Sequence, residues 1–360
     1  MRVYNFSAGP ATLPLEVLEQ LREELPDWHN LGMSVMELSH RNRDFIEVAA
    51  QAEADLRSLL DVPAEYRVLF LQGGATGLWA GLALNLTAPE AAVDYVLTGH
   101  WSVKAAREAR NFCADVHVAA DAREGGYTHV PAQSQWQLRP QAAYVHYCPN
   151  ETIGGVECPF IPDTNGVPLV ADFSSSILSQ PLDVRRFGVI YASTQKNIGP
   201  AGLCMVIVHE SLLGRARTAT PTVWNWQTMS GSDSMANTPP TLTWYLCGLV
   251  FKWLHRQGGL VAMGERSERK ARTLYAAIDA SGFYGNRVQP DCRSRINVPF
   301  FLADPKLDAQ FLSESRAAGL ANLKGHAAVG GMRASLYNPM PQAGVDALVD
   351  FMSDFERRHG

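Results

Sequence analysis

Two ionisable side chains stand where an apolar run gives way to a turn-rich segment. Asp172 lies at the end of the run LVADF (169–173), and Lys196 follows the run VIYAS (189–193). An amine in an apolar, glycine-rich loop has a lowered pKa, because burial disfavours its charged form, and it then acts as a nucleophile. Such an amine forms a Schiff base with an aldehyde cofactor. A carboxylate at the end of a buried strand needs a cation or a donor nearby.

Other candidate residues also follow apolar runs. A glycine-rich turn (73–77) precedes a helical pattern, and backbone N–H groups at such a turn bind phosphate. Trp101 and Thr152 follow two further runs and offer a stacking face and a hydroxyl group. Taken singly, these are equally a tight turn, a packed aromatic and a turn cap. With Asp172 and Lys196 they match the requirements of pyridoxal phosphate, whose aldehyde needs a lysine and whose pyridinium nitrogen needs an acid.

The elements that must position these residues form an alternating pattern. Short β-branched runs recur along the first two thirds of the chain, with helical patterns between several of them. This alternation predicts an α/β fold whose mostly parallel, seven-stranded sheet carries helices on both faces. Ligands bind at the carboxyl ends of the strands in such sheets. The expected strands cover residues 67–71, 95–98, 115–118, 143–148, 169–173, 189–193 and 204–208.

The sequence pattern changes after about residue 240. A long helical stretch with a break at Gly258 and Gly259 is followed by mixed short strands and helices, which predicts a smaller α+β C-terminal domain. The opening segment is too rich in turns to start the main sheet. We therefore expect a large cofactor-binding domain over residues 14–255 and a small domain from residues 1–13 and 256–360.

Composition excludes several other classes. A net charge of −5, with no run of basic residues, argues against a nucleic-acid partner. The longest apolar stretch (242–254) contains Gly248 and Lys252 and is shorter than a membrane span of ~20 residues. No signal-peptide pattern opens the chain, so a cytoplasmic location is expected. Cysteines without CxxC pairs and histidines without ligand spacing predict that no metal is bound.

Beyond these patterns, the sequence resembles the phosphoserine aminotransferases, within class V of the fold-type I pyridoxal-phosphate enzymes. The resemblance runs nearly end to end. Its most specific segments are NFSAGPATLP (5–14), YVHYCPNETIGGVE (144–157), ADFSSSILSQPLDV (171–184), YASTQKNIGPAG (191–202) and NTPPT (237–241). Two more segments separate this family from other class V members, namely MSVMELSHRNRDF (33–45) and GHAAVGGMRASLYN (325–338).

The resemblance implies a role for each cofactor-site residue. Lys196 would be the Schiff-base lysine, Asp172 the partner of the pyridinium nitrogen, and Trp101 the residue that stacks on the ring. Thr152 would reach the phenolic oxygen of the cofactor. Three residues would hold the cofactor phosphate, namely Ala75, Thr76 and Gln195. Two more would reach the phosphate in the neighbouring subunit, which implies a homodimer with shared active sites; these are Asn237 and Thr238.

For the substrates, the resemblance implies glutamate and 3-phosphohydroxypyruvate, with O-phospho-L-serine formed for serine biosynthesis. Arg333 would bind the α-carboxylate, and His40 and Arg41 of the partner subunit would bind the distal phosphate or carboxylate. Many relatives carry an arginine where this chain has Ala327, so His40, Arg41 and His326 are expected to compensate. A four-carbon substrate, giving 4-phosphohydroxy-L-threonine for pyridoxine biosynthesis, is a further expectation.

Three alternative functions remain open from the sequence. Another class V enzyme, a desulfurase or a small-amino-acid aminotransferase, would use the same cofactor. A desulfurase also needs a cysteine in a mobile polar loop, and Cys292 is the one candidate. A non-catalytic cofactor-binding protein would not need the substrate arginines. A nicotinamide dehydrogenase would need the GxGxxG fingerprint, which the glycine-rich turn lacks.

Overall fold

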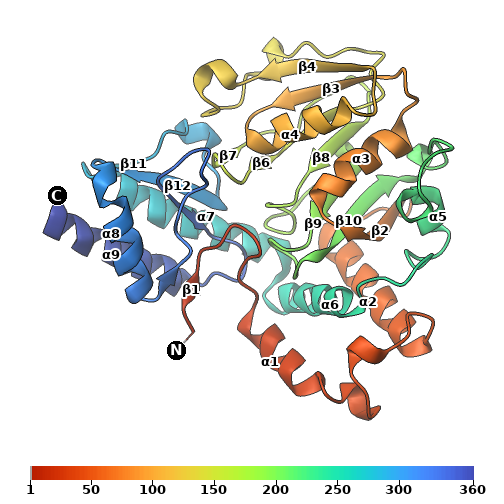
Figure 1. The fold of residues 1–360 in the computed structure, drawn as a ribbon, viewed down its shortest axis with the longest axis horizontal. Helices are drawn as coiled ribbons and strands as arrows, with labels where there is room; N and C mark the ends of the chain where they lie inside the picture. Colours follow the sequence, from red (N-terminus) through yellow and green to blue (C-terminus); the bar gives the residue numbers. More distant parts are fainter. Residues whose placement is uncertain (1) are drawn as a thin grey trace.

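A seven-stranded sheet forms the centre of the protein in a computed structural model that describes residues 2–360 (Figure 1). One strand, β10, runs antiparallel to both of its neighbours, and the other neighbouring pairs are parallel. The predicted α/β fold with a mostly parallel seven-stranded sheet is therefore confirmed. In spatial order the strands are β2 (Tyr66–Gly73), β10 (Gly202–His209), β9 (Val189–Ser193), β8 (Leu169–Asp172), β5 (Val145–Tyr147), β3 (Ala92–Leu97) and β4 (Asp115–Asp121).

Both faces of this sheet are buried. Successive side chains of β2 alternate between two cores, with Val68 and Phe70 in one and Leu69 and Leu71 in the other. A strand buried on both sides needs apolar residues at every position, which explains the continuous apolar runs in the sequence. One face is covered by α3 (Ala75–Leu86), α4 (His100–Ala109) and α5 (Trp226–Ser230), and the other by α2 (Arg43–Leu60) and α6 (Thr241–Arg256).

The C-terminal part of the chain has a third core of its own, which includes Phe6 from the chain start. Short strand β1 (Tyr4–Asn5) pairs with β13 (Leu320–Ala321) and thereby joins the two ends of the sequence. Around this core lie α7 (Gly259–Asp279), β11 (Tyr284–Gly285), β12 (Asn297–Leu302), α8 (Asp308–Ala317), β14 (Met332–Ser335) and α9 (Gln342–His359). The domain boundaries expected at residues 13 and 255 stay a prediction. The first turns of α7, which follow residue 255, pack on the core beneath the large sheet.

Two smaller elements complete the architecture. Helix α1 (Leu15–Glu24) leads away from the chain start and packs beside α6, and the hairpin of β6 (Asn150–Glu151) and β7 (Val156–Glu157) follows β5. Among the described residues, no helix is both long and apolar enough to cross a membrane.

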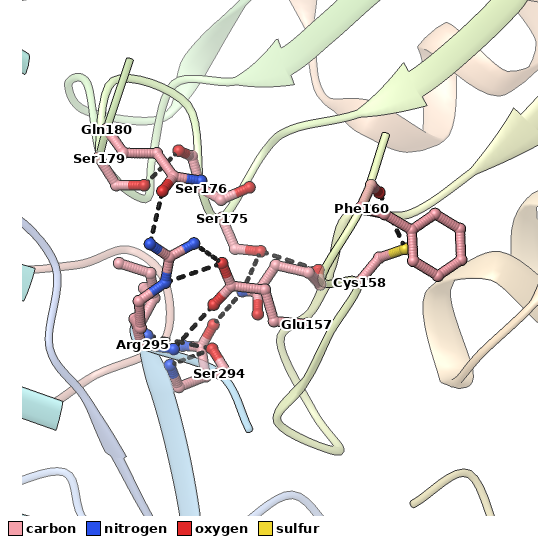
Figure 2. A network of polar contacts seen from close by, with 12 residues as sticks. Glu157, Cys158, Phe160, Ser175, Ser176, Ser179, Gln180, Ser294 and Arg295 are labelled. Atoms are coloured by element: carbon pink, nitrogen blue, oxygen red, sulfur yellow. Dashed lines mark hydrogen bonds and ion pairs between the residues drawn. The ribbon is translucent and has the colours of Figure 1, made fainter. Parts of the chain in front are cut away.

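An ion pair joins the hairpin to the C-terminal part, as Figure 2 shows. Arg295 donates to the carboxylate of Glu157 through its backbone N–H at 2.8 Å and its Nε at 3.1 Å. The same guanidinium group donates to the side chain of Gln180, which follows β8. Because Arg295 precedes β12, this contact fixes the C-terminal sheet against the edge of the large sheet where β8 ends.

A buried lysine organises the loop that follows β14. Lys270 on α7 donates from Nζ to the backbone oxygens of Leu336 and Tyr337 at 2.8 Å and of Met340 at 3.2 Å. Burial and the nearby Arg266 and Arg269 lower the pKa of Lys270 to about 7. Its amine is thus the donor for three backbone carbonyls of residues that are buried away from water.

We expect Lys270→Met to lower the free energy of unfolding by about 2 kcal/mol, because it leaves those buried carbonyls without a donor. The matched control is Lys306→Met at an exposed lysine, which should leave stability within about 0.5 kcal/mol. Urea unfolding of both variants measures the difference. Equal stabilities of the Lys270 and Lys306 variants would contradict the role given to Lys270.

The stability gap between the wild type and Lys270→Met should also depend on pH. The folded-state pKa of about 7 lies below the unfolded value of about 10.4, so the unfolded chain binds more protons between these values. Stability therefore rises with pH through this window in the wild type only. Urea unfolding at pH 7 and pH 9 should show the gap widening as pH rises; a narrowing gap would contradict the assigned shift.

Candidate active site

Lys196 lies in the loop between β9 and β10, at the edge of the sheet where the parallel strands end. Its Nζ donates a hydrogen bond to Oγ1 of Thr152 at 2.7 Å. The same Nζ lies 5.5 Å from the centroid of the Trp101 ring. Three predicted site residues from separate segments of the sequence thus meet at one point.

The surroundings of Lys196 favour a reactive amine. Burial is the main cause that lowers its pKa, and the positive charge of Arg333 acts in the same direction. The negative charges of Asp172 and Glu151 oppose this shift. A lysine with a lowered pKa is more often neutral near pH 7 and is then available as a nucleophile or a base.

Asp172 is the last residue of β8 and is 7% exposed. Its Oδ1 accepts a hydrogen bond from the backbone N–H of Ser174 at 2.9 Å. This bond and the parallel pairing of β8 with β9 fix the carboxylate beside the start of the Lys196 loop. The predicted pairing of an aspartate and a lysine at neighbouring strand ends therefore has a physical basis in this sheet.

Glu151 holds the helix that carries Trp101, a role that the sequence did not predict. Its fully buried carboxylate accepts hydrogen bonds from the backbone N–H of Trp101 at 3.0 Å and of Ser102 at 2.8 Å. The Ser102 hydroxyl donates to it at 2.7 Å. Burial raises the pKa of Glu151 despite these bonds. A Cβ at Gly99 would lie 2.5 Å from Cδ of Glu151, so the carboxylate occupies this helix start completely.

The glycine-rich turn meets the same edge of the sheet. Gly73 has φ +110, a conformation that L side chains rarely adopt, and α3 begins two residues later. The backbone N–H of Ala75 donates to Oγ of Ser193, the last residue of β9, at 2.9 Å. Ala75 and its neighbour Thr76 therefore lie next to the strand that leads to Lys196.

The opening segment of the chain crosses this region. The backbone N–H of Ala11 donates to the backbone oxygen of Gln195 at 2.9 Å. A Cβ at Gly9 would lie 3.3 Å from Cγ of Lys196, so a glycine is needed for this close approach. The first residues of the chain therefore lie directly against the loop that carries Lys196.

These residues fit pyridoxal phosphate by their chemistry. An amine, a carboxylate and an aromatic face gather at one strand edge, beside a turn of the kind that accepts a phosphate.

Arg333 reaches the site from β14 of the C-terminal part. Its Nη1 donates to the backbone oxygen of Thr152 at 3.2 Å, and burial lowers its pKa. His326 stands in the loop before β14, where its Nδ1 accepts the N–H of Ala328 at 3.1 Å. Of these two substrate candidates, Arg333 is joined directly to the residues that surround Lys196.

Four other predicted residues lie elsewhere in this chain. His40 and Arg41 follow a 3-10 helix (Val35–Glu37) in the segment between α1 and α2, which Figure 1 places at the far side of α6. Asn237 and Thr238 precede α6, and the backbone oxygen of Thr238 accepts a bond from the Gln72 side chain at 2.7 Å. None of the hydrogen bonds or ion pairs of the described residues joins these four to Lys196.

Comparison with known proteins gives the same assignment over the full chain. The family model described as aminotransferase class V matches residues 3–348. The chain is 56% identical over 360 residues to a phosphoserine aminotransferase of Xanthomonas campestris pv. campestris (strain 8004), covering 100% of this chain and 99% of that one. It is 55% identical over 359 residues to the phosphoserine aminotransferase of Pseudomonas aeruginosa, with the same coverage.

Solved structures show the same fold. The phosphoserine aminotransferase from Bacillus circulans subsp. alkalophilus superposes with a TM-score of 0.97 at 43% identity, covering 100% of this chain and 99% of that one. The pyridoxal-phosphate-bound enzyme from Trichomonas vaginalis gives a TM-score of 0.94 at 41% identity, covering 98% and 100%. With its fold, its site and its relatives in agreement, the chain belongs to the class V aminotransferase family, among the phosphoserine aminotransferases.

Proposed function

We propose that this chain moves the amino group of glutamate to 3-phosphohydroxypyruvate, which yields 2-oxoglutarate and O-phospho-L-serine for serine biosynthesis. The observation that carries the proposal is the double contact of Thr152. Its hydroxyl accepts from the amine of Lys196, and its backbone oxygen accepts from the guanidinium of Arg333. A nucleophilic amine and a carboxylate-binding cation are thereby held on one residue, as an α-amino acid substrate requires.

Pyridoxal phosphate is the cofactor, and when bound it withdraws electrons from the substrate Cα so that a proton can leave. Lys196 supplies the amine that holds its aldehyde carbon, and Asp172 supplies the carboxylate for its ring nitrogen. Trp101 offers a ring face and Thr152 a hydroxyl to the phenolic oxygen. The phosphate is assigned to three residues around the glycine-rich turn, namely Ala75, Thr76 and Gln195.

The side chains of the site divide the work of the reaction. Arg333 orients the substrate by a two-pronged contact to its α-carboxylate. Lys196, once its amine is free, would take the proton from the substrate Cα as a general base and deliver it as a general acid to the former aldehyde carbon of the cofactor, on the other side of the shared nitrogen. Asp172 would keep a proton on the ring nitrogen, because a carboxylate beside that nitrogen favours the protonated ring. In this scheme Thr152 orients the Lys196 amine through the hydrogen bond that its hydroxyl oxygen accepts from Nζ.

The proposal includes a homodimer with shared active sites. Asn237 and Thr238 would reach the cofactor phosphate of the partner subunit, and His40 and Arg41 would reach its substrate. Support comes from their contacts in this chain, because none of the hydrogen bonds or ion pairs of the described residues joins them to its own Lys196. Arg41 is exposed and forms no ion pair with any described residue, so it is free to bind an anion of another chain.

Two further parts of the proposal rest on the family resemblance. The same site would aminate a four-carbon phosphorylated oxo acid, giving 4-phosphohydroxy-L-threonine for pyridoxine biosynthesis. The enzyme would act in the cytoplasm, where the amino acids of primary metabolism are made.

The desulfurase hypothesis finds no support at its required nucleophile. Cys292, the candidate cysteine, is 3% exposed, and burial raises the pKa of its thiol. A catalytic cysteine needs a lowered pKa and an accessible loop. The aminotransferase hypothesis therefore accounts for more of the observed site.

Replacing the central amine tests the whole assignment. Lys196→Ala should lower kcat by at least about 1,000-fold, because it removes both the nucleophile and the proton carrier. It should also remove the glutamate-sensitive visible absorbance of the purified enzyme. Lys306→Ala, at an exposed lysine, is the matched control and should keep both signals. Retained turnover in the Lys196→Ala enzyme would sink the assignment.

The carboxylate of Asp172 is tested by an isosteric change. Asp172→Asn keeps an acceptor for the Ser174 N–H but removes the negative charge. We expect the cofactor to remain bound and the half-reaction with glutamate to slow by about 100-fold or more. Stopped-flow absorbance with glutamate measures this rate. A normal half-reaction rate in a cofactor-loaded variant would refute the role of Asp172.

Glu151→Gln tests whether the buried carboxylate positions Trp101. The new amide group would set an N–H donor against the backbone donors of α4, so we expect a loss of about 2 kcal/mol in the free energy of unfolding. Gly99→Ala should have a similar effect, because its Cβ overlaps the carboxylate. Urea unfolding is the measurement, with exposed Glu90→Gln as the control. Stabilities equal to the control in both variants would disprove this role.

A further inference from the structure

Three basic side chains lie along one side of helix α4. His100, Lys104 and Arg107 are spaced by four and three residues, so they share a helix face. The ring of His100 lies 5.3 Å from the ring of His326, centroid to centroid. Nζ of Lys104 lies 5.3 Å from the centroid of the Trp101 ring, which the reactive amine also approaches. The N-terminal end of this face therefore borders the candidate active site.

No carboxylate of the described residues forms an ion pair with His100 or Lys104. After burial, the groups that lower the pKa of His100 are Lys104, His326 and Arg107, all of them basic side chains. The pKa of His326 is lowered by burial and by Arg333 and Lys104. The neighbouring basic groups thus disfavour a further positive charge on either ring, and an anion bound between them would relieve that effect.

The donors of this cluster are not used within the chain. The His326 ring accepts the Ala328 N–H at Nδ1, so the proton of its neutral form stands on Nε2. None of the hydrogen bonds of residues 2–360 involves the His100 ring or the Lys104 amine. The backbone donors at the start of α4 are already taken by Glu151. An anion here would be bound by side chains rather than by the helix start.

The position of the cluster indicates which part of a substrate it would meet. Arg333 and Lys196 are held together through Thr152 and account for the α-carboxylate and the reacting carbon. His326 belongs to the same loop-and-strand segment as Arg333, and His100 adjoins the Trp101 ring. Residue 327, next to His326, is an alanine and adds no charge. An imidazole ring and an ammonium group from α4, those of His100 and Lys104, stand where that loop alone offers one imidazole ring.

We propose that His100 and Lys104, with His326, bind the terminal phosphate of the oxo-acid substrate and set the preference for phosphorylated over unphosphorylated substrates. This inference rests on the proposed function, because it assigns one end of the substrate named there. A phosphate dianion suits the cluster better than a carboxylate does, since it carries more charge and more acceptor oxygens.

The experiment compares two substrates in three variants of the holoenzyme. His100→Ala and Lys104→Met should each lower kcat/KM for 3-phosphohydroxypyruvate by about tenfold or more, the usual effect of losing a charged hydrogen bond. With hydroxypyruvate, which has no phosphate, kcat/KM should stay within about twofold of the wild type. Arg107→Met, one turn further along α4, is the matched control and should change neither value by more than about twofold.

Each contrary outcome overturns a different statement. A His100→Ala enzyme that loses equal activity on both substrates would show that the ring positions Trp101 and does not bind the phosphate. If His100→Ala and Lys104→Met leave kcat/KM unchanged for both substrates, neither side chain binds the substrate. A wild type that does not aminate 3-phosphohydroxypyruvate at all would overturn the proposed function itself, and this inference with it.

A double variant tests whether the loss of activity in His100→Ala comes from a missing contact to the phosphate and not from a disturbed structure. Ala327→Arg in the His100→Ala background places a guanidinium group beside His326, and it should restore at least half of the lost selectivity for the phosphorylated substrate. Restoration identifies the missing contribution as a positive charge at this end of the substrate. If the double variant stays as weak as His100→Ala on 3-phosphohydroxypyruvate while hydroxypyruvate is unaffected, the phosphate assignment is wrong.

Discussion

Three consecutive residues after β5 hold the separate parts of the site in register. The Asn150 side chain donates to the Asn297 side chain at 2.8 Å, which ties the hairpin to the C-terminal sheet. Glu151 binds the start of α4, and Thr152 accepts bonds from both Lys196 and Arg333. The side chains of this tripeptide alternate in direction, as in any extended segment, so each residue can serve a different neighbour. Asn150, Glu151 and Thr152 are themselves buried, so their polar groups depend on these contacts because water is not available to replace them.

Local charge, not total charge, determines what this protein can bind. The chain is acidic overall at −5, yet every predicted ligand is an anion. Lys196 and Arg333 lie in a partly buried region where their charges are weakly screened, and Asp172 and Glu151 limit the resulting repulsion. The same desolvation that makes an amine reactive would destabilise the fold if no carboxylate lay near. The paired acids at two strand ends are thus part of the chemistry and of the stability.

The sequence alone predicted the sheet well, because a strand buried on both faces must be apolar at every position. The lysine and the aspartate were found by the same logic, since parallel strands end at one edge. Glu151, His100 and Lys104 could not be found in this way. A single acid beside a strand end and two cations on a helix are common on any surface, and their roles arise from contacts with segments distant in the sequence. The assignments of His40, Arg41, Asn237 and Thr238 depend on the family resemblance, because they concern a second chain.

The C-terminal part of the chain contacts the loop that carries Lys196 as well as contributing Arg333. Lys270 fixes the backbone of the loop after β14, and in that loop the N–H of Asn338 donates to the side chain of Asn197 at 2.9 Å. Asn197 directly follows Lys196, so a displacement of this loop would be transmitted to the reactive amine. Arg333, in the strand that leads into the loop, would move with it. The positions of the Arg333 guanidinium group and the Lys196 amine are therefore coupled through one short, buried segment, so the candidate site needs both parts of the chain.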